Sequence, residues 1–136
     1  MAAWGDLNEP FIQVGFLIYD IDHVQLPIPK GEEHSARQFY GGLLGMTEID
    51  KPENLRRRGG VWFTLGPRHL HLGVQEEFRP ATKAHPAFLV DDLRALAARL
   101  QDGGYPIVTD EPLPGYDRFY STDPFGNRLE FLRPRD

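Results

Sequence analysis

An internal repeat restricts the fold of this chain more than any other feature. Residues 21–75 and 85–133 are each predicted to contain, in the same order, a strand, a helix and three further strands. Two such β-α-β-β-β units with curved mixed sheets are expected to pair into one half-open cup, with the helices outside. The repeat and the length of 136 residues therefore predict a single α+β domain.

Periodic apolar positions place one helix in each half. The first helix is predicted over residues 33–44, and Gly45 suits its end. The second is predicted to follow Asp91 or Asp92, either of which can cap it. Four apolar residues mark one stripe on each helix, at i, i+3, i+4 and i+7: Ala36, Phe39, Tyr40 and Leu43 in the first, and Leu93, Leu96, Ala97 and Leu100 in the second.

The strands are predicted from short apolar runs between turns. They cover residues 21–28, 46–49, 60–65 and 69–75 in the first half, and 85–90, 106–109, 118–121 and 128–132 in the second. The stretch Asp123–Gly126 has the residue order of a type I turn. This turn sets the register of the last hairpin, and therefore the face on which Glu130 lies.

Composition narrows the classes of function. The chain is 40% hydrophobic and 26% charged, as a globular domain is, and its net charge of -5 gives no reason to expect a nucleic-acid partner. The basic cluster Arg56–Arg58 is either a solvated loop or an attractor for an anionic substrate. No apolar run resembles a signal peptide or a membrane span, so we expect no membrane partner and a cytoplasmic location.

Residues 1–20 precede the repeat and form an N-terminal arm. Its run Phe11–Tyr19 is too apolar to be left in water, and we expect it to be an added strand or a packing arm. An exposed strand of this composition favours aggregation unless it is covered. The arm therefore predicts a subunit interface and a homodimer.

Four side chains that can bind a divalent metal occupy matching positions in the two halves. His23 and His85 lie in the first strand of each half, and His71 and Glu130 lie in the last. Since the chain has no cysteine, a metal must be held by nitrogen and oxygen ligands. The topology is expected to bring all four side chains to the middle of the cup.

Each candidate ligand has a structural alternative. His23 and His85 suit histidines at the core edge that bind backbone carbonyls, and His69 lies on the strand face of His71 and is able to share or replace its role. Glu130 stands in an apolar strand, so its carboxylate needs a cation, a hydrogen-bond donor or a raised pKa.

Several short motifs resemble one known family. They are Ile21-Asp22-His23-Val24, Leu44-Gly45-Met46 after the first helix, and the stretch from Asp123 to Glu130. Over residues 21–133 the chain resembles the vicinal oxygen chelate superfamily, which includes glyoxalase I, fosfomycin-modifying enzymes, extradiol dioxygenases and bleomycin-binding proteins.

The resemblance implies a metal site on the first and last strand of each module. Its ligands match His23, His71, His85 and Glu130, and the implied cofactor is a divalent ion such as Zn, Ni, Mn or Fe. Glyoxalase I usually has Glu or Gln where this chain has His71. Dioxygenase-type and fosfomycin-type sites are similar to the subset without His71, which is then a fourth ligand or an acid/base group.

The resemblance implies a metal-dependent enzyme that acts on a small substrate with vicinal oxygens. The reaction would be lyase or isomerase chemistry by proton transfer, with Glu130 and His71 as the catalytic side chains, or dioxygenase chemistry. The alternative is a metal-free protein that sequesters a small drug, as bleomycin-resistance proteins do. A third reading is a member whose fold serves as an interaction scaffold.

Overall fold

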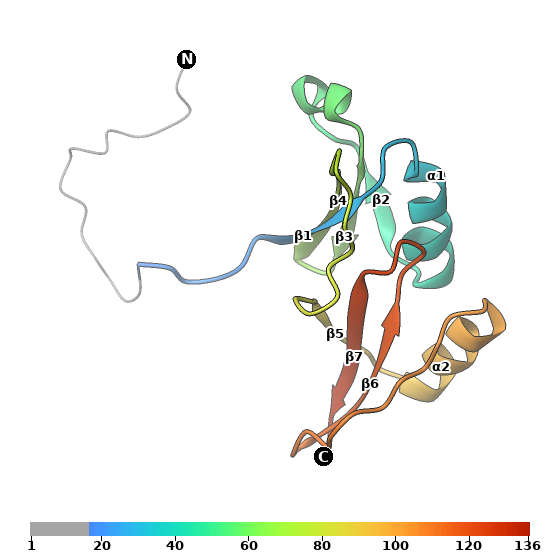
Figure 1. The fold of residues 1–136 in the computed structure, drawn as a ribbon. Coiled ribbons are helices and arrows are strands. Elements are labelled where there is room, and N and C mark those ends of the chain that lie inside the picture. Colours follow the sequence, from blue (N-terminus) through green and yellow to red (C-terminus); the bar gives the residue numbers. More distant parts are fainter. Residues whose placement is uncertain (1–16) are drawn as a thin grey trace.

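The computed structural model describes residues 17–136, and its strands form two mixed sheets (Figure 1). The first sheet has the order β1-β4-β3-β2 and the second the order β5-β7-β6. In each sheet one outer strand runs parallel to its neighbour and the other pairs are antiparallel. The predicted α+β fold with two repeated modules is confirmed.

The first module follows the predicted order. Its elements are β1 (His23–Ile28), α1 (Glu33–Ala36), the π-helical turns η1 (Arg37–Leu43), β2 (Thr47–Ile49), the 3-10 helix η2 (Glu53–Arg58), β3 (Val61–Leu65) and β4 (Arg68–Val74). The predicted helix is thus present but widens after Ala36, and Gly45 follows its end with φ of 79°. Its stripe faces the core, where Phe39 and Tyr40 are buried.

The second module contains β5 (Ala87–Leu89), α2 (Leu93–Asp102), β6 (Tyr116–Thr122) and β7 (Arg128–Pro134). Asp92 caps α2 by accepting a hydrogen bond of 3.0 Å from the amide of Ala95. The predicted strand over 106–109 is wrong, because this stretch makes a single bridge, between Val108 and Tyr120. Pro106 cannot donate to a ladder, which limits pairing there.

One core extends through both modules. Aromatic side chains from the first, such as Phe39 and Phe63, and from the second, such as Phe131, belong to the same buried cluster. Asn127 fixes the modules further: its amide group donates to the Pro27 carbonyl at 2.8 Å and accepts from the Ala81 amide at 2.9 Å. The relative placement of the two sheets is therefore specified by buried contacts.

The predicted N-terminal arm lies mainly outside the described residues. Of Phe11–Tyr19, the structure describes Leu17, Ile18 and Tyr19, whose exposed fractions are 72%, 85% and 90%. Within residues 17–136, no helix has the length and apolar character needed to cross a membrane.

Candidate functional site

The first module contributes a stack of three aromatic rings. Strands β1 and β4 are parallel neighbours, and the rings of His23 and His71 stack with centroids 4.1 Å apart. Trp62 on β3 lies opposite His71 in the sheet register, and its ring stacks at 3.8 Å with an interplanar angle of 3°. His71 thus makes its closest ring contacts with these two neighbours.

The stack keeps His71 neutral and leaves one of its nitrogens without a partner. Burial, helped by the nearby imidazoles of His23 and His69, lowers the pKa of His71 from 6.5 to about 4. Its buried Nε2 atom has no hydrogen-bond partner among the described residues. A buried polar atom of this kind calls for a ligand, and an unprotonated imidazole nitrogen is a metal donor.

His23 is oriented by its neighbour in the chain. Its Nδ1 atom lies 3.0 Å from an Asp22 carboxylate oxygen. When Nδ1 donates to this carboxylate, Nε2 is left with its lone pair, which is the arrangement found in metal-binding histidines. The hydrogen bond with His23 also lowers the pKa of Asp22.

The second module brings His85 and Glu130 into contact. Strands β5 and β7 run side by side, with Ala87 opposite Glu130, and the His85 Nε2 atom lies 2.9 Å from Glu130 Oε1. The other ring nitrogen of His85 lies 2.9 Å from the Lys83 carbonyl. Both nitrogens therefore face acceptors, and satisfying both requires a second proton on the ring or a cation at Nε2.

Hydrogen bonds from two neighbours, one of them a guanidinium, keep the Glu130 carboxylate ionised. Burial alone would raise the pKa of Glu130, but hydrogen bonds with His85 and Arg118 outweigh it and the net shift is downward. Arg118 donates from Nη1 to Glu130 Oε2 at 3.3 Å and to the Tyr120 hydroxyl at 2.7 Å. The sequence prediction missed Arg118, although it lies two residues before Tyr120 on β6 and therefore shares its face.

The four predicted ligands form two pairs instead of one group. Within residues 17–136, no three His, Asp or Glu side chains lie close enough together to hold a metal ion. The expected meeting of all four in one cup is therefore wrong for the single chain. The physical reason is that His23 and His71 lie in one sheet and Glu130 in the other, and no strand ladder joins the two sheets. His85 was predicted in a strand over 85–90, but β5 begins at Ala87 and His85 lies just before it.

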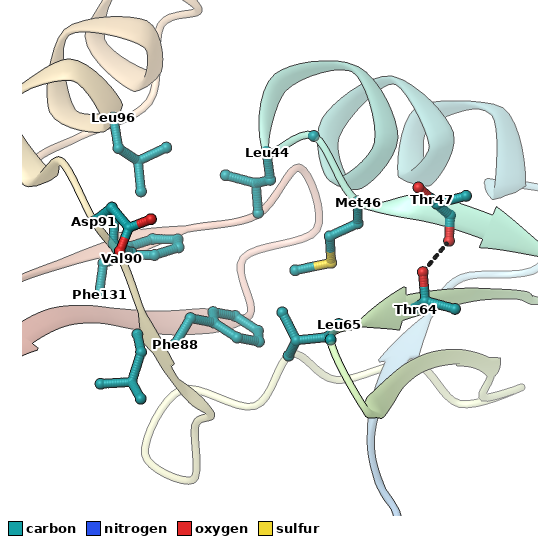
Figure 2. Close-up of a pocket in the computed structure, with 13 residues that line it drawn as sticks. Leu44, Met46, Thr47, Thr64, Leu65, Phe88, Val90, Asp91, Leu96 and Phe131 are labelled. Atoms are coloured by element: carbon teal, nitrogen blue, oxygen red, sulfur yellow. Dashed lines mark hydrogen bonds between the residues drawn. The ribbon is translucent and has the colours of Figure 1, made fainter.

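Two cavities of about 420 Å³ lie between the modules, and they differ in chemistry. One is lined by apolar side chains such as Met46, Leu65 and Phe88, with Asp91 as its one ionisable residue (Figure 2). The polar part of the lining of the other comprises three histidines and two charged residues, namely His23, His69, His85, Asp20 and Arg68. Only the second offers imidazole nitrogens, and it includes two of the four predicted ligands, so we assign the candidate site to that side of the sheets.

Comparisons with known proteins agree with this fold. Residues 20–131 match the model of the Glyoxalase/Bleomycin resistance protein/Dioxygenase superfamily. A putative glyoxalase family protein from Bacillus anthracis is 45% identical with a TM-score of 0.85, and the match covers 90% of this chain and 100% of that one. The comparison with curated proteins gave no match.

Two further solved structures support the fold at lower identity. A lactoylglutathione lyase from Agrobacterium tumefaciens is 19% identical with a TM-score of 0.68, over 87% of this chain and 96% of that one. An antibiotic binding protein from Streptomyces sp. CB03234 is 21% identical with a TM-score of 0.66, over 89% and 100%. With the match of residues 20–131 and the relative that is 45% identical, this chain belongs to the Glyoxalase/Bleomycin resistance protein/Dioxygenase superfamily.

Proposed function

We propose that this protein is a metal-dependent enzyme that acts on a small substrate with two adjacent oxygens. The observation that carries the proposal is the contact within two pairs of candidate ligands, His23 with His71 and His85 with Glu130. Each pair offers two donors, and a first-row divalent ion takes four or more.

The donor chemistry fits such an ion. His71 is neutral with a buried unpartnered nitrogen, and Glu130 is ionised. Nitrogen and carboxylate donors suit Zn, Ni, Mn or Fe and leave room for substrate oxygens. A bound ion would supply Lewis-acid stabilisation of negative charge on those oxygens.

A second copy of the chain is the proposed source of the missing half of each site. Strands β1 and β5 are outer strands of their sheets, and apolar residues at or beside them are exposed: Ile21 by 65%, Val24 by 37% and Leu89 by 72%. Exposed apolar edges are normally covered by pairing. We propose a homodimer in which the first-module pair of one copy meets the second-module pair of its partner.

The chain's own residues then account for proton transfer. Glu130 is the general base, which takes a proton from the carbon beside the substrate oxygens and returns it to a neighbouring atom. Arg118 holds the glutamate ionised, as this role requires. His71 serves as a further ligand or as a second acid/base group. This assignment favours lyase or isomerase chemistry over dioxygenase chemistry.

Metal-induced stabilisation tests the assignment. Metal at about a hundred times its dissociation constant should stabilise the wild type by roughly 2.7 kcal/mol. The Glu130→Ala variant should lose most of this gain together with turnover, and the exposed Glu76→Ala control should keep both. Equal stabilisation of the wild type and Glu130→Ala would place the metal elsewhere.

Mixed dimers test whether two copies share each site. His23→Ala and Glu130→Ala each damage a different pair, so each variant alone should bind metal poorly. A heterodimer of the two joins the intact first-module pair of one copy to the intact second-module pair of the other. Refolding the variants together should therefore restore one of the two sites. No recovery of metal binding would contradict a site shared between copies.

Binding without metal is the second candidate function. The flat stack of Trp62, His71 and His23 is a surface on which an aromatic ligand can pack, and the fold is similar to that of an antibiotic binding protein. Metal content of untagged protein separates the two functions. Metal-free protein whose thermal stability rises with planar aromatic compounds, and not with divalent ions, would favour binding over catalysis.

A further inference from the structure

A third, smaller cavity lies on the same face of the first sheet as His71. In the sheet register His71 stands opposite Gln25 on β1 and Trp62 on β3, and Gly73 follows two residues later on β4. Side chains alternate along a strand, so these positions share one face. Gln25, Trp62 and Gly73 line a cavity of about 270 Å³, which therefore begins where the ring stack ends.

The segment from Lys51 to Gly60 closes this cavity and is seated firmly on the sheet. Gly59 and Gly60 turn the chain with φ of 72° and 85°, and a side chain at Gly60 would collide with the Leu72 carbonyl. The Gly60 amide donates to Glu33 Oε2 at 2.8 Å. Lys51 donates from Nζ to the Gly59 carbonyl. These contacts hold η2 over the end of the sheet.

The lining of the cavity is positively charged. Lys51 and Arg58 line it, and none of its lining residues is acidic. In the part of the chain that the structure describes, neither side chain takes part in an ion pair. Burial, opposed by Glu33 and helped by Arg58, lowers the pKa of Lys51. The ammonium group still has donors that the Gly59 carbonyl does not use.

We infer that this cavity, here called the Lys51–Arg58 pocket, binds the anionic group of the substrate, a carboxylate or a phosphate. The inference rests on the proposed function for the reacting end of the substrate, which lies at the His71 side. Two residues along a strand span about 7 Å. The substrate is therefore a small acid whose anionic group lies several bonds from its paired oxygens, with the apolar part against Trp62.

Fluorescence of Trp62 offers a direct test. The chain has two tryptophans, so a Trp4→Phe background leaves Trp62 as the reporter. Inorganic phosphate and succinate are titrated in turn into metal-free protein with EDTA at constant ionic strength. The expected result is a saturable signal that becomes about tenfold weaker in affinity in Arg58→Ala, the loss typical of one charged hydrogen bond.

Arg57→Ala is the matched control, because it removes the same charge from the next residue, which does not line the cavity. Its affinity should stay within about twofold of that of the parent. Lys51→Ala should also weaken binding. Because it also removes the hydrogen bond to the Gly59 carbonyl, its effect combines lost charge with altered structure, and Arg58→Ala is the decisive variant. No saturable signal in the parent, or equal weakening in Arg57→Ala and Arg58→Ala, overturns the inference.

The measurement separates this inference from the proposed function, because it uses no metal. Anion binding without any metal-induced stabilisation would refute the metal-dependent activity and leave the pocket intact. Metal-induced stabilisation without anion binding would refute the pocket alone. Tighter succinate than phosphate identifies a carboxylate as the preferred group, and the reverse identifies a phosphate.

Discussion

Asn127 is the buried side chain on which the relative placement of the modules depends most directly. It is fully buried, and its amide group makes three hydrogen bonds: to the Pro27 carbonyl, to the Asp123 carboxylate and from the Ala81 amide. These partners belong to the first module, to the turn before β7 and to the connection between the modules. Asn127→Ala removes all three bonds without adding bulk.

The cost follows from what each partner retains. Asp123 keeps hydrogen bonds from the Tyr40 hydroxyl and from two backbone amides. The Pro27 carbonyl and the Ala81 amide lose their bonds to Asn127 while partly buried. A buried backbone group without a partner costs about 1–3 kcal/mol, and a lost bond to a carboxylate costs about as much. We therefore expect a loss of about 3–5 kcal/mol in the free energy of unfolding.

Urea unfolding followed by circular dichroism measures this loss. For a domain of this size it corresponds to a fall in Tm of roughly 10–20 °C. Asn54→Ala is the control, since Asn54 is exposed on η2 and makes no side-chain hydrogen bond within the described residues. Its stability should change by less than about 0.5 kcal/mol. A loss of under about 1 kcal/mol in Asn127→Ala would refute the view that this amide clamps the modules.

Two further predictions concern pH and backbone strain. His71 has a pKa of about 4 in the folded chain, below its ordinary 6.5, so its contribution to stability is present above pH 6.5 and is lost as the pH falls toward 4. Urea unfolding of metal-free protein at pH 7 and at pH 4.5 measures how much free energy of unfolding is lost on acidification. This loss should be about 2–3 kcal/mol smaller in His71→Leu than in the wild type or in the exposed His34→Gln control. Gly60→Ala should lower Tm more than Gly104→Ala, because both residues have positive φ but only the Cβ at 60 meets a carbonyl oxygen, and equal losses would contradict that steric argument.

The repeat predicted the fold because its signals are local. The apolar stripes, an aspartate cap on the second helix and the Gly45 terminus each depend on residues a few positions apart, and all of them appear in the structure. Pairing of residues 106–109 failed because a ladder depends on both partners. Val108 pairs with Tyr120 on β6, but Pro106 has no amide hydrogen to donate, so the pairing does not extend into a strand.

The candidate site was predicted in its parts and not in its assembly. Spacing placed His71 and Glu130 on the last strand of each module, which the structure bears out. Whether two sheets meet face to face depends on packing between modules, and periodicity within one strand carries no information on it. The same limit hid Arg118, whose importance arises from its contact with Glu130 across the hairpin.

The Asn127 clamp has a consequence for the order in which the chain acquires its structure during synthesis. Its hydrogen bond to the Pro27 carbonyl joins residues 100 positions apart. A ribosome makes the first module, the linker and α2 before it makes this asparagine. The first sheet therefore leaves the ribosome before the bond that fastens it to the second module can form, and β7, which follows Asn127, completes the second sheet. Such distant contacts form slowly, because a long loop must close before they stabilise the chain.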